Sequence, residues 1–326
     1  MANIIIMTPK LSYEKYGYTI PEEWDADFIS ANSTDEELIR AAADAQCLVV
    51  GSGQVVSRKV IESCPKLKLI QTEGVGFDKV DVEAAKERGV WVCNNKGANA
   101  ISVAEHAIGL MLAGLRRTSL TDHQLRTIGY RASKIEHLKA GEHSLAGKTV
   151  GLVGLGDIGK QVAKRLMFWE CNVVYNDILD MSPEIEKEYH VSYMDFDELI
   201  KTCDIISMHV PVTPLTAGMI GKEQFAAMKK TALLINTSRG DVIDQDALIW
   251  ALENDEIYGA AVDVVTPEPL PDDAPILNMS PEAMKKITIT PHVAGVTDED
   301  FNRMTGMTIQ VIKRLLKGEE PLNLVY

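Results

Sequence analysis

Paired cysteines, long apolar runs and basic charge are scarce in this chain, and each shortage excludes a class of protein. The five cysteines are odd in number and widely spaced, and none belongs to a C-x-x-C motif. They favour buried thiols in a reducing compartment over a disulfide framework. No two histidines have the spacing of zinc ligands, so we expect no metal site.

No stretch of the sequence predicts a membrane helix. The apolar run at 107–115 has nine residues, whereas a membrane helix needs about 20. The opening Met-Ala-Asn-Ile-Ile-Ile-Met lacks a basic segment and a long apolar core, so it predicts a first strand rather than a signal peptide. We therefore expect a cytoplasmic protein.

Acidic residues outnumber basic ones by 47 to 33, which gives a formal net charge of −14. This balance disfavours nucleic acid and anionic membranes, so we expect neither as a partner. It still allows an anionic substrate, because one arginine can dominate the field inside a closed pocket. The length of 326 residues predicts two domains, since single cores stop growing near roughly 250–300 residues.

Alternating strands and helices predict an α/β fold in both parts of the chain. The first part has apolar runs separated by helical segments, with strands expected at 3–7, 47–50, 67–71 and 90–93. The second part predicts a six- or seven-stranded sheet, with strands expected at 149–153, 172–175, 205–208, 232–235, 259–262 and 287–290. Continuous apolar strands indicate parallel sheets covered by helices on both faces.

Two hinge-like segments, at 94–100 and 291–295, suggest how the domains are connected. We expect one discontinuous domain, 1–100 and 296–326, and one inserted domain, 101–295. The helical segment 101–117 is apolar on most sides, which predicts a buried position at a domain or subunit interface. Residues 118–147 are polar and weakly periodic, and we predict no element there.

Three glycines predict a dinucleotide site after the first strand of the inserted domain. Gly154, Gly156 and Gly159 have G-x-G-x-x-G spacing between an apolar run and a helical segment. The first allows a sharp turn, the second lets the backbone approach a pyrophosphate, and the third lets helix and strand pack closely. Asp177, at the end of the next apolar run, is placed to bind a ribose 2′-hydroxyl and to repel a 2′-phosphate. The pattern predicts NAD rather than NADP, with a merely tight turn as the alternative.

Four polar motifs follow apolar runs of the inserted domain, and the carboxyl ends of parallel strands are where ligands bind. They are His209-Val210-Pro211, Asn236-Thr237-Ser238-Arg239-Gly240, Asp263 with Pro267-Glu268-Pro269, and Pro291-His292-Val293-Ala294-Gly295.

Within these motifs, Arg239, Glu268 and His292 suit the oxidation of a hydroxyl that lies next to a carboxylate. Histidine can accept the hydroxyl proton near neutral pH. A neighbouring carboxylate orients the imidazole and stabilises its protonated form. Arginine can hold a planar carboxylate with two parallel hydrogen bonds.

Together the motifs resemble the D-isomer-specific 2-hydroxyacid dehydrogenase family. Gly74-Val75-Gly76-Phe77-Asp78 and Ser102-Val103-Ala104-Glu105-His106 resemble it as well, so the resemblance covers nearly the whole chain, in order. It implies two doubly wound parallel-sheet domains, with a Rossmann NAD-binding domain inserted into a smaller flavodoxin-like substrate domain. It also implies a homodimer built through the cofactor domain and the helix after the first hinge.

The resemblance implies a role for each motif. Arg239 would hold the substrate carboxylate together with backbone amides near Val75 and Gly76, Glu268 would be the partner of the base, and His292 would be the acid/base. Asp263 would contact the nicotinamide carboxamide. The full set expected to bind NAD is Val103, Gly154, Gly156, Asp157, Ile158, Gly159, Asp177, Val210, Pro211, Thr216, Thr237, Asp263, His292 and Gly295.

These expectations predict an NAD-dependent D-2-hydroxyacid dehydrogenase that runs as a 2-ketoacid reductase, with hydride transfer between nicotinamide C4 and substrate C2. Gly129-Tyr130 stands where members often carry tryptophan. Gly51-Ser52-Gly53-Gln54 stands where phosphoglycerate-specific members carry arginines, which disfavours a phosphorylated substrate. The alternatives are an NAD(H)-sensing, corepressor-like regulatory protein on the same fold, and a relative that oxidises formate or phosphite.

Overall fold

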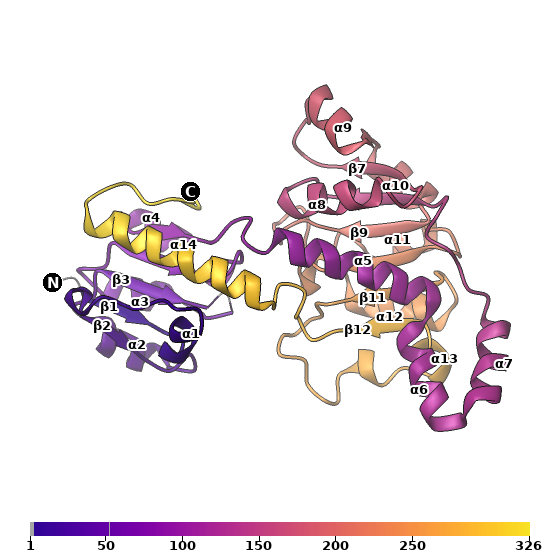
Figure 1. The fold of residues 1–326 in the computed structure, drawn as a ribbon, viewed down its shortest axis with the longest axis horizontal. Coiled ribbons are helices and arrows are strands. Elements are labelled where there is room, and N and C mark those ends of the chain that lie inside the picture. Colours follow the sequence, from indigo (N-terminus) through magenta and orange to yellow (C-terminus); the bar gives the residue numbers. More distant parts are fainter. Residues whose placement is uncertain (1–2, 52) are drawn as a thin grey trace. The chain divides into compact units, whose positions relative to one another are not determined.

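The computed structural model describes residues 3–51 and 53–326. Ser52, from the segment compared above with phosphoglycerate-specific enzymes, lies outside the described residues, as do Met1 and Ala2 of the expected first strand. The chain forms two compact units: unit 1 is Met1–Asn99 with Val296–Tyr326, and unit 2 is Ala100–Gly295. Figure 1 shows that each unit has its own sheet with helices packed against it.

Unit 1 contains a five-stranded parallel sheet in the order β2-β1-β3-β4-β5. This is the flavodoxin-like order. The strands are β1 (Ile4–Ile6), β2 (Ala26–Phe28), β3 (Cys47–Val50), β4 (Leu69–Thr72) and β5 (Trp91–Cys93). The helices are α1 (Lys10–Lys15), η1 (Glu22–Trp24), α2 (Asp35–Ala42), α3 (Arg58–Ser63), α4 (Val82–Glu87) and α14 (Asp298–Leu316).

Unit 2 contains a seven-stranded parallel sheet in the order β12-β11-β10-β9-β6-β7-β8. If β6 is numbered as strand 1 and the sheet is read from the β8 edge, the order is 3-2-1-4-5-6-7. This is the Rossmann order 3-2-1-4-5-6 with one strand added. The strands are β6 (Thr149–Val153), β7 (Asn172–Asn176), β8 (Val191–Tyr193), β9 (Ile205–Met208), β10 (Leu233–Asn236), β11 (Gly259–Val262) and β12 (Ile287–Ile289). The predicted fold class is therefore confirmed.

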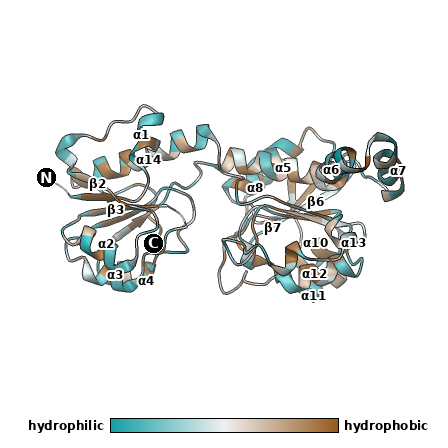
Figure 2. Cartoon of the chain, turned by 90° about the horizontal axis from the view of Figure 1, so that it is seen from below, coloured by the Kyte–Doolittle hydropathy of each residue, from teal (hydrophilic) through white to brown (hydrophobic). Residues whose placement is uncertain are grey.

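The helices of unit 2 lie on both faces of its sheet (Figure 2). They are α5 (Ala100–Arg116), α6 (Thr118–Ile128), α7 (Tyr130–Ala140), α8 (Asp157–Leu166), α9 (Pro183–Tyr189), α10 (Phe196–Thr202), α11 (Lys222–Ala227), η2 (Gly240–Val242), α12 (Gln245–Glu253), η3 (Pro275–Leu277) and α13 (Pro281–Met284). Among the described residues, no helix is long and apolar enough to cross a membrane.

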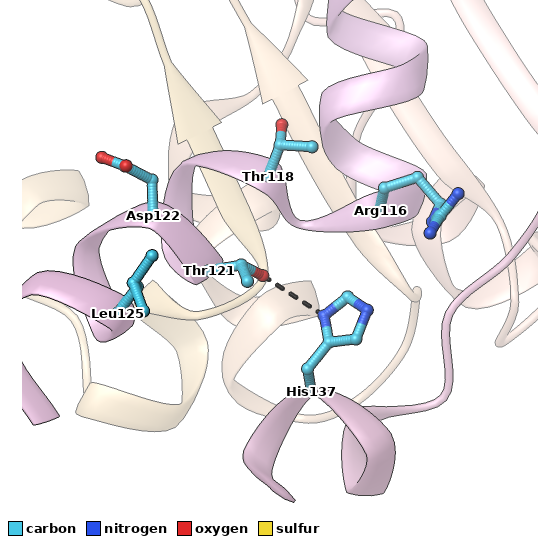
Figure 3. Close-up of a pocket in the computed structure, with 6 residues that line it drawn as sticks. All are labelled: Arg116, Thr118, Thr121, Asp122, Leu125 and His137. Atoms are coloured by element: carbon cyan, nitrogen blue, oxygen red, sulfur yellow. Dashed lines mark hydrogen bonds between the residues drawn. The ribbon is translucent and has the colours of Figure 1, made fainter. Parts of the chain in front are cut away.

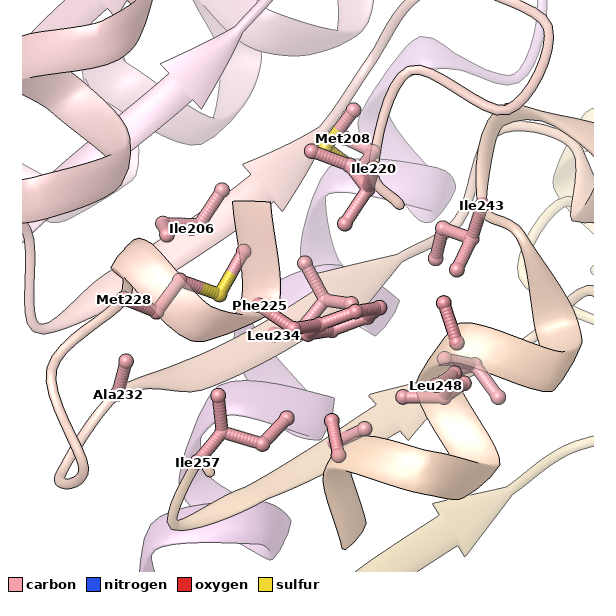
Figure 4. Packing of buried hydrophobic residues seen from close by; sticks show 14 of the residues in the cluster. Ile206, Met208, Ile220, Phe225, Met228, Ala232, Leu234, Ile243, Leu248 and Ile257 are labelled. Atoms are coloured by element: carbon pink, nitrogen blue, oxygen red, sulfur yellow. The ribbon is translucent and has the colours of Figure 1, made fainter. Parts of the chain in front are cut away.

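Successive residues of the central strands in unit 2 pack on opposite faces, which is why these strands are continuous apolar runs in the sequence. In β10, Leu233 and Ile235 pack with α5 and α8, whereas Leu234 packs with α11 and α12 on the other face. Figure 4 shows the second cluster, in which Phe225 of α11 lies beside Leu234. Both faces of the sheet are therefore buried, as a doubly wound fold requires.

Three parts of the fold were not predicted. Residues 118–147, which gave no periodic signal, form the helices α6 and α7, and Gly129 between them has a φ of +80°. The strands β2 and β8 have three residues each and lie at sheet edges, so neither produces a long apolar run. Helix α1 lies between the expected strands 3–7 and 47–50 and was not predicted.

Candidate active site

The glycine motif forms a tight connection between β6 and α8. Gly154 has a φ of +99°, and a Cβ built on it would lie 2.6 Å from the carbonyl oxygen of His209. A Cβ on Gly159 would lie 2.3 Å from the carbonyl oxygen of Gly154. A Cβ on Gly156, by contrast, meets no atom of the described residues within 4 Å. The first and third glycines are thus required by packing, and the second faces open space at a helix N-terminus, where a phosphate fits.

Asp177 follows β7 and is joined to the glycine motif by a hydrogen bond. Its Oδ2 accepts the backbone N–H of Leu155 at 2.7 Å, and its Oδ1 accepts that of Leu179 at 2.9 Å. A carboxylate has about four acceptor positions, so two remain for a ligand. The side chain therefore orders the loop in addition to presenting acceptors at the strand end.

At the carboxyl ends of β9 and β10, two buried polar atoms have no hydrogen-bond partner among the described residues. They are Nδ1 of His209 and Oγ1 of Thr237. The other ring nitrogen of His209, Nε2, shares a hydrogen bond with Ser207 at 2.9 Å, and burial lowers the pKa of His209 to about 4. The imidazole is consequently neutral at physiological pH. Buried polar atoms of this kind normally have a partner, so both fit a bound ligand at this edge.

The segment after β10 is folded back by its own side chains. Asn236 accepts from the backbone N–H and the hydroxyl of Ser238 and donates to the carbonyl of Arg239 at 2.8 Å. A Cβ on Gly240 would lie 2.4 Å from the carbonyl carbon of Val265. The Asn-Thr-Ser-Arg-Gly motif thus packs its glycine against the segment that leads to Glu268. The half-buried Arg239 donates one hydrogen bond to the carbonyl of Ser238.

Asp263, only 1% exposed, organises the loop that carries His292. Its carboxylate accepts the hydroxyl of Thr290 at 2.5 Å and the backbone N–H groups of Val293 and Ala294 at 2.9 and 2.8 Å. Its carbonyl accepts the backbone N–H of His292 at 2.7 Å. These bonds fix His292 in a left-handed conformation with a φ of +54°, which a non-glycine residue adopts only when its surroundings impose it.

His106 and Thr290 belong to this arrangement, although the sequence did not assign them to the site. Nε2 of His106, on α5, lies 3.0 Å from Oγ1 of Thr290 and 3.5 Å from Oδ1 of Asp263. Helix α5 is thereby linked to the loop that follows β12. Both residues belong to motifs that the sequence showed: His106 ends Ser-Val-Ala-Glu-His, and Thr290 directly precedes Pro-His. Neither motif, however, predicts that the two residues are in contact.

His292 and Glu268 form a direct hydrogen bond between Nδ1 and Oε1. Both side chains are exposed, at 42% and 49%. Because Nδ1 faces the carboxylate, Nε2 is left to face a ligand. The two peptide bonds that flank this segment, Thr266–Pro267 and Glu268–Pro269, are cis. The strands that carry the trio are neighbours, since β11 lies between β10 and β12.

The remaining predicted cofactor residues of unit 2 occupy varied surroundings. Thr216 donates its hydroxyl to the carbonyl of Pro211 at 2.6 Å, so this turn is closed on itself. Val103 is buried in α5, Asp157 is exposed in the first turn of α8, and Val210 approaches Gly154. Ile158 packs against the core of unit 2, and Gly295 is half-buried.

The predicted carboxylate-binding segment, Gly74-Val75-Gly76, belongs to unit 1 and follows β4. Asn94 donates to the carbonyl of Val75 at 2.7 Å, and the backbone N–H of Asn95 donates to the carbonyl of Gly74 at 2.9 Å. In the part of the chain that the structure describes, the amides of Val75 and Gly76 have no protein acceptor. They are available to a ligand.

A cavity of about 340 Å³ lies elsewhere, at the base of the α6–α7 hairpin (Figure 3). It is lined by Arg116, Thr118, Thr121, Asp122, Leu125 and His137, and Nδ1 of His137 lies 3.2 Å from the hydroxyl of Thr121. None of the predicted site residues lines it. This cavity is therefore separate from the predicted active site.

Four features together define an NAD-binding oxidoreductase. They are the Rossmann strand order, the second glycine of the motif facing open space, the acidic residue after the second strand of unit 2, and the hydrogen-bonded His–Glu pair. The comparisons with known proteins agree. Residues 108–294 match the family model described as D-isomer specific 2-hydroxyacid dehydrogenase, NAD binding domain. The chain belongs to the D-isomer specific 2-hydroxyacid dehydrogenase family, as its motifs predicted.

Individual relatives span this family. The chain is 40% identical over 302 residues to a D-3-phosphoglycerate dehydrogenase of Methanocaldococcus jannaschii, covering 91% of this chain and 55% of the relative. It is 38% identical over 291 residues to a glyoxylate reductase of Thermofilum pendens, covering 89% and 84%. The chain therefore spans about half the length of the first relative and most of the second.

The chain is also similar to a solved structure that contains bound NAD. It is the NAD-dependent formate dehydrogenase of Staphylococcus aureus in complex with NAD, with a TM-score of 0.82, 29% identity, and coverage of 98% of this chain and 97% of the other.

Proposed function

We propose that this chain is an NADH-dependent 2-ketoacid reductase that forms D-2-hydroxy acids, with His292 as the acid/base. The hydrogen bond between His292 and Glu268 is the observation that carries the proposal. Bound NADH supplies the hydride. The protein must then deliver one proton to the substrate oxygen, and an imidazole whose Nδ1 is held by a carboxylate can deliver it from Nε2.

Arg239 and the unit 1 amides supply the substrate-binding part of the proposal. The guanidinium can hold the substrate carboxylate and polarise the neighbouring keto oxygen. The family resemblance also assigns the amides of Val75 and Gly76 to substrate binding. Unit 1 would therefore act as the substrate domain, and unit 2, matched by the NAD-binding family model, as the cofactor domain.

The His–Glu pair favours this reaction over the oxidation of formate. Formate loses a hydride to become carbon dioxide and releases no proton from an oxygen, so its oxidation requires no acid/base. Reduction of a ketone requires one. The buried carboxylate of Asp263, whose hydrogen bonds position His292, would have no chemical purpose in an enzyme that transfers hydride alone.

The test is a spectrophotometric assay of NADH oxidation with glyoxylate, pyruvate, hydroxypyruvate and phosphohydroxypyruvate, with formate and NAD as a separate reaction. We expect turnover of at least one unphosphorylated 2-ketoacid and none of formate. The His292→Gln variant should lose about 100-fold or more in kcat, since general acid–base catalysis contributes roughly 10²–10⁴-fold. Exposed His123→Gln is the matched control. Inactivity of the native protein on every ketoacid would exclude the proposal.

We also propose a homodimer that uses the α6–α7 hairpin. No residue of α6 is buried, and large apolar side chains are exposed on both helices, namely Leu125, Ile128, Tyr130, Ile135 and Leu138. Large exposed apolar side chains on two neighbouring helices are typical of an interface. Light scattering should give twice the 35.9 kDa mass of the chain. Leu138→Arg should give the monomer mass, whereas Leu11→Arg, at a comparably exposed leucine of unit 1, should not.

The free state of the five cysteines and the acidic net charge support a cytoplasmic location and the absence of a nucleic-acid partner in this proposal.

A further inference from the structure

Glu73 occupies an unusual position in unit 1. It follows β4 at the carboxyl edge of the sheet and directly precedes Gly74-Val75-Gly76. Its Oε1 accepts the hydroxyl of Tyr13 and its Oε2 accepts the hydroxyl of Thr8. Tyr13 lies on α1 and Thr8 follows β1, so two distant parts of the sequence meet at this edge.

Glu73 is half-buried at this edge of the sheet. Burial raises the pKa of Glu73 to about 7. No lysine, arginine or histidine among the described residues forms an ion pair with it. Tyr13 is only 1% exposed and stacks edge-on against Phe28. A desolvated carboxylate without a cation is costly, and a purely structural link between β1 and β4 could be made by neutral groups at lower cost.

The backbone next to Glu73 is held rigidly. Asn95 donates through Nδ2 to the carbonyl of Glu73 at 3.0 Å, and the backbone N–H of Glu73 donates to the carbonyl of Val50 at 2.8 Å. The half-buried Glu73 and Thr8 are thus fixed beside the free amides of Val75 and Gly76. Each carboxylate oxygen accepts one hydroxyl and keeps a second acceptor position.

We propose that Glu73, held by Tyr13 and Thr8, recognises the side chain of the substrate and selects a 2-ketoacid that carries a hydrogen-bond donor and no negative charge. This inference rests on the proposed 2-ketoacid reductase activity and names its substrate class. The hydroxyls of Tyr13 and Thr8 both donate to this carboxyl group and favour its ionised form, which only accepts hydrogen bonds, so a hydroxyl or cationic group on the substrate is favoured. A phosphate is repelled, which agrees with the lack of basic side chains in the described part of the Gly51–Gln54 segment.

The test compares three ketoacids that differ at one carbon: pyruvate, 3-hydroxypyruvate and 3-phosphohydroxypyruvate. For the native protein, kcat/KM with hydroxypyruvate should exceed that with either of the others by about 10-fold to 100-fold, the range that one hydrogen bond to a charged group provides. In Glu73→Gln the amide is neutral and can also donate, so the preference over phosphohydroxypyruvate should fall at least 10-fold.

Glu14→Gln, an exposed acid on α1, is the matched control and should keep the native ratios. NADH affinity and thermal unfolding show whether each variant is folded, and Thr8→Val, which removes only one of the two hydroxyls, provides a milder second change in the same direction. Native ratios in Glu73→Gln and Thr8→Val would overturn the inference while leaving the reductase proposal intact. Inactivity of the native protein on all three ketoacids would overturn both.

Discussion

The hydroxyl of Thr290 donates to the buried carboxylate of Asp263 at 2.5 Å, and this bond joins the end of β12 to the end of β11. The same carboxylate holds the next two backbone amides after His292. The position of His292 is therefore set by a group that does not touch its ring.

This link predicts the effect of Thr290→Val, which keeps the shape of the side chain and removes the hydroxyl. Stability should fall by about 1.5–3 kcal/mol, the range for a hydrogen bond to a charged group. We expect kcat to fall at least 10-fold and NADH affinity to change less than 3-fold, because the change displaces His292 rather than the glycine motif. Thr288→Val on the same strand is the control. An unchanged kcat would show that the loop keeps its conformation without this bond.

The glycine motif predicts a difference between two substitutions of the same kind. Gly156→Ala places a methyl group in open space, so thermal stability should stay within about 2 °C, while NADH affinity falls at least 10-fold because the methyl group occupies the phosphate position. Gly159→Ala forces a contact with the carbonyl of Gly154 and should lower the unfolding temperature by several degrees. Calorimetry and NADH fluorescence measure both. Equal behaviour of the two variants would contradict the assignment.

Asp177 predicts coenzyme selectivity. Asp177→Asn retains an acceptor for the N–H of Leu155 but removes the negative charge. The ratio of NADPH to NADH dissociation constants should therefore fall about 10-fold, largely through tighter NADPH binding. Asp180→Asn, an exposed acid three residues further along, should leave the ratio unchanged. If Asp177→Asn also leaves it unchanged, another group excludes the 2′-phosphate.

His209 predicts a pH dependence of stability. Its pKa is lowered from 6.5 to about 4 by burial, so between these values the unfolded state binds more protons than the folded state. The folded state is consequently destabilised as pH falls from 6.5 to 4, by up to about 3 kcal/mol. Replacement by asparagine should remove this dependence, so that the difference in unfolding free energy between native protein and variant changes with pH only inside that window. Exposed His123→Gln should show no such change.

The sequence predicted most strands of both sheets because both faces are buried, which makes each strand a continuous apolar run. The prediction from sequence failed where an element is not marked by a periodic pattern of apolar residues. Helices α6 and α7 have almost no buried residues, with Ser133 the one on α7, so their apolar residues are few and give a weaker helical signal than those of a packed helix. Short edge strands such as β8 lack a second covered face.

The candidate site likewise contains a part that the sequence predicted and a part that it did not. Arg239, Glu268 and His292 stand in motifs with distinctive neighbours, and the contact of the last two is present in the structure. The contact between His106 and Thr290 could not be predicted, because 184 positions separate them and either residue alone is compatible with ordinary packing. The same is true of Glu73, whose partners Thr8 and Tyr13 lie 65 and 60 positions before it.

The discontinuity of unit 1 has a consequence for synthesis on the ribosome. Its sheet is complete once residue 93 has been made, but one face of that sheet packs against Ile309, Val311, Ile312 and Leu315 of α14. All of unit 2 must leave the ribosome between the synthesis of residue 93 and that of α14. While unit 2 is translated as one uninterrupted segment, the apolar face that contains Ile4, Ile6, Val49 and Leu69 is therefore only partly covered, by residues such as Tyr13 and Trp24. Unit 2 can fold first, and a nascent chain stalled before residue 298 would expose the surface that chaperones recognise.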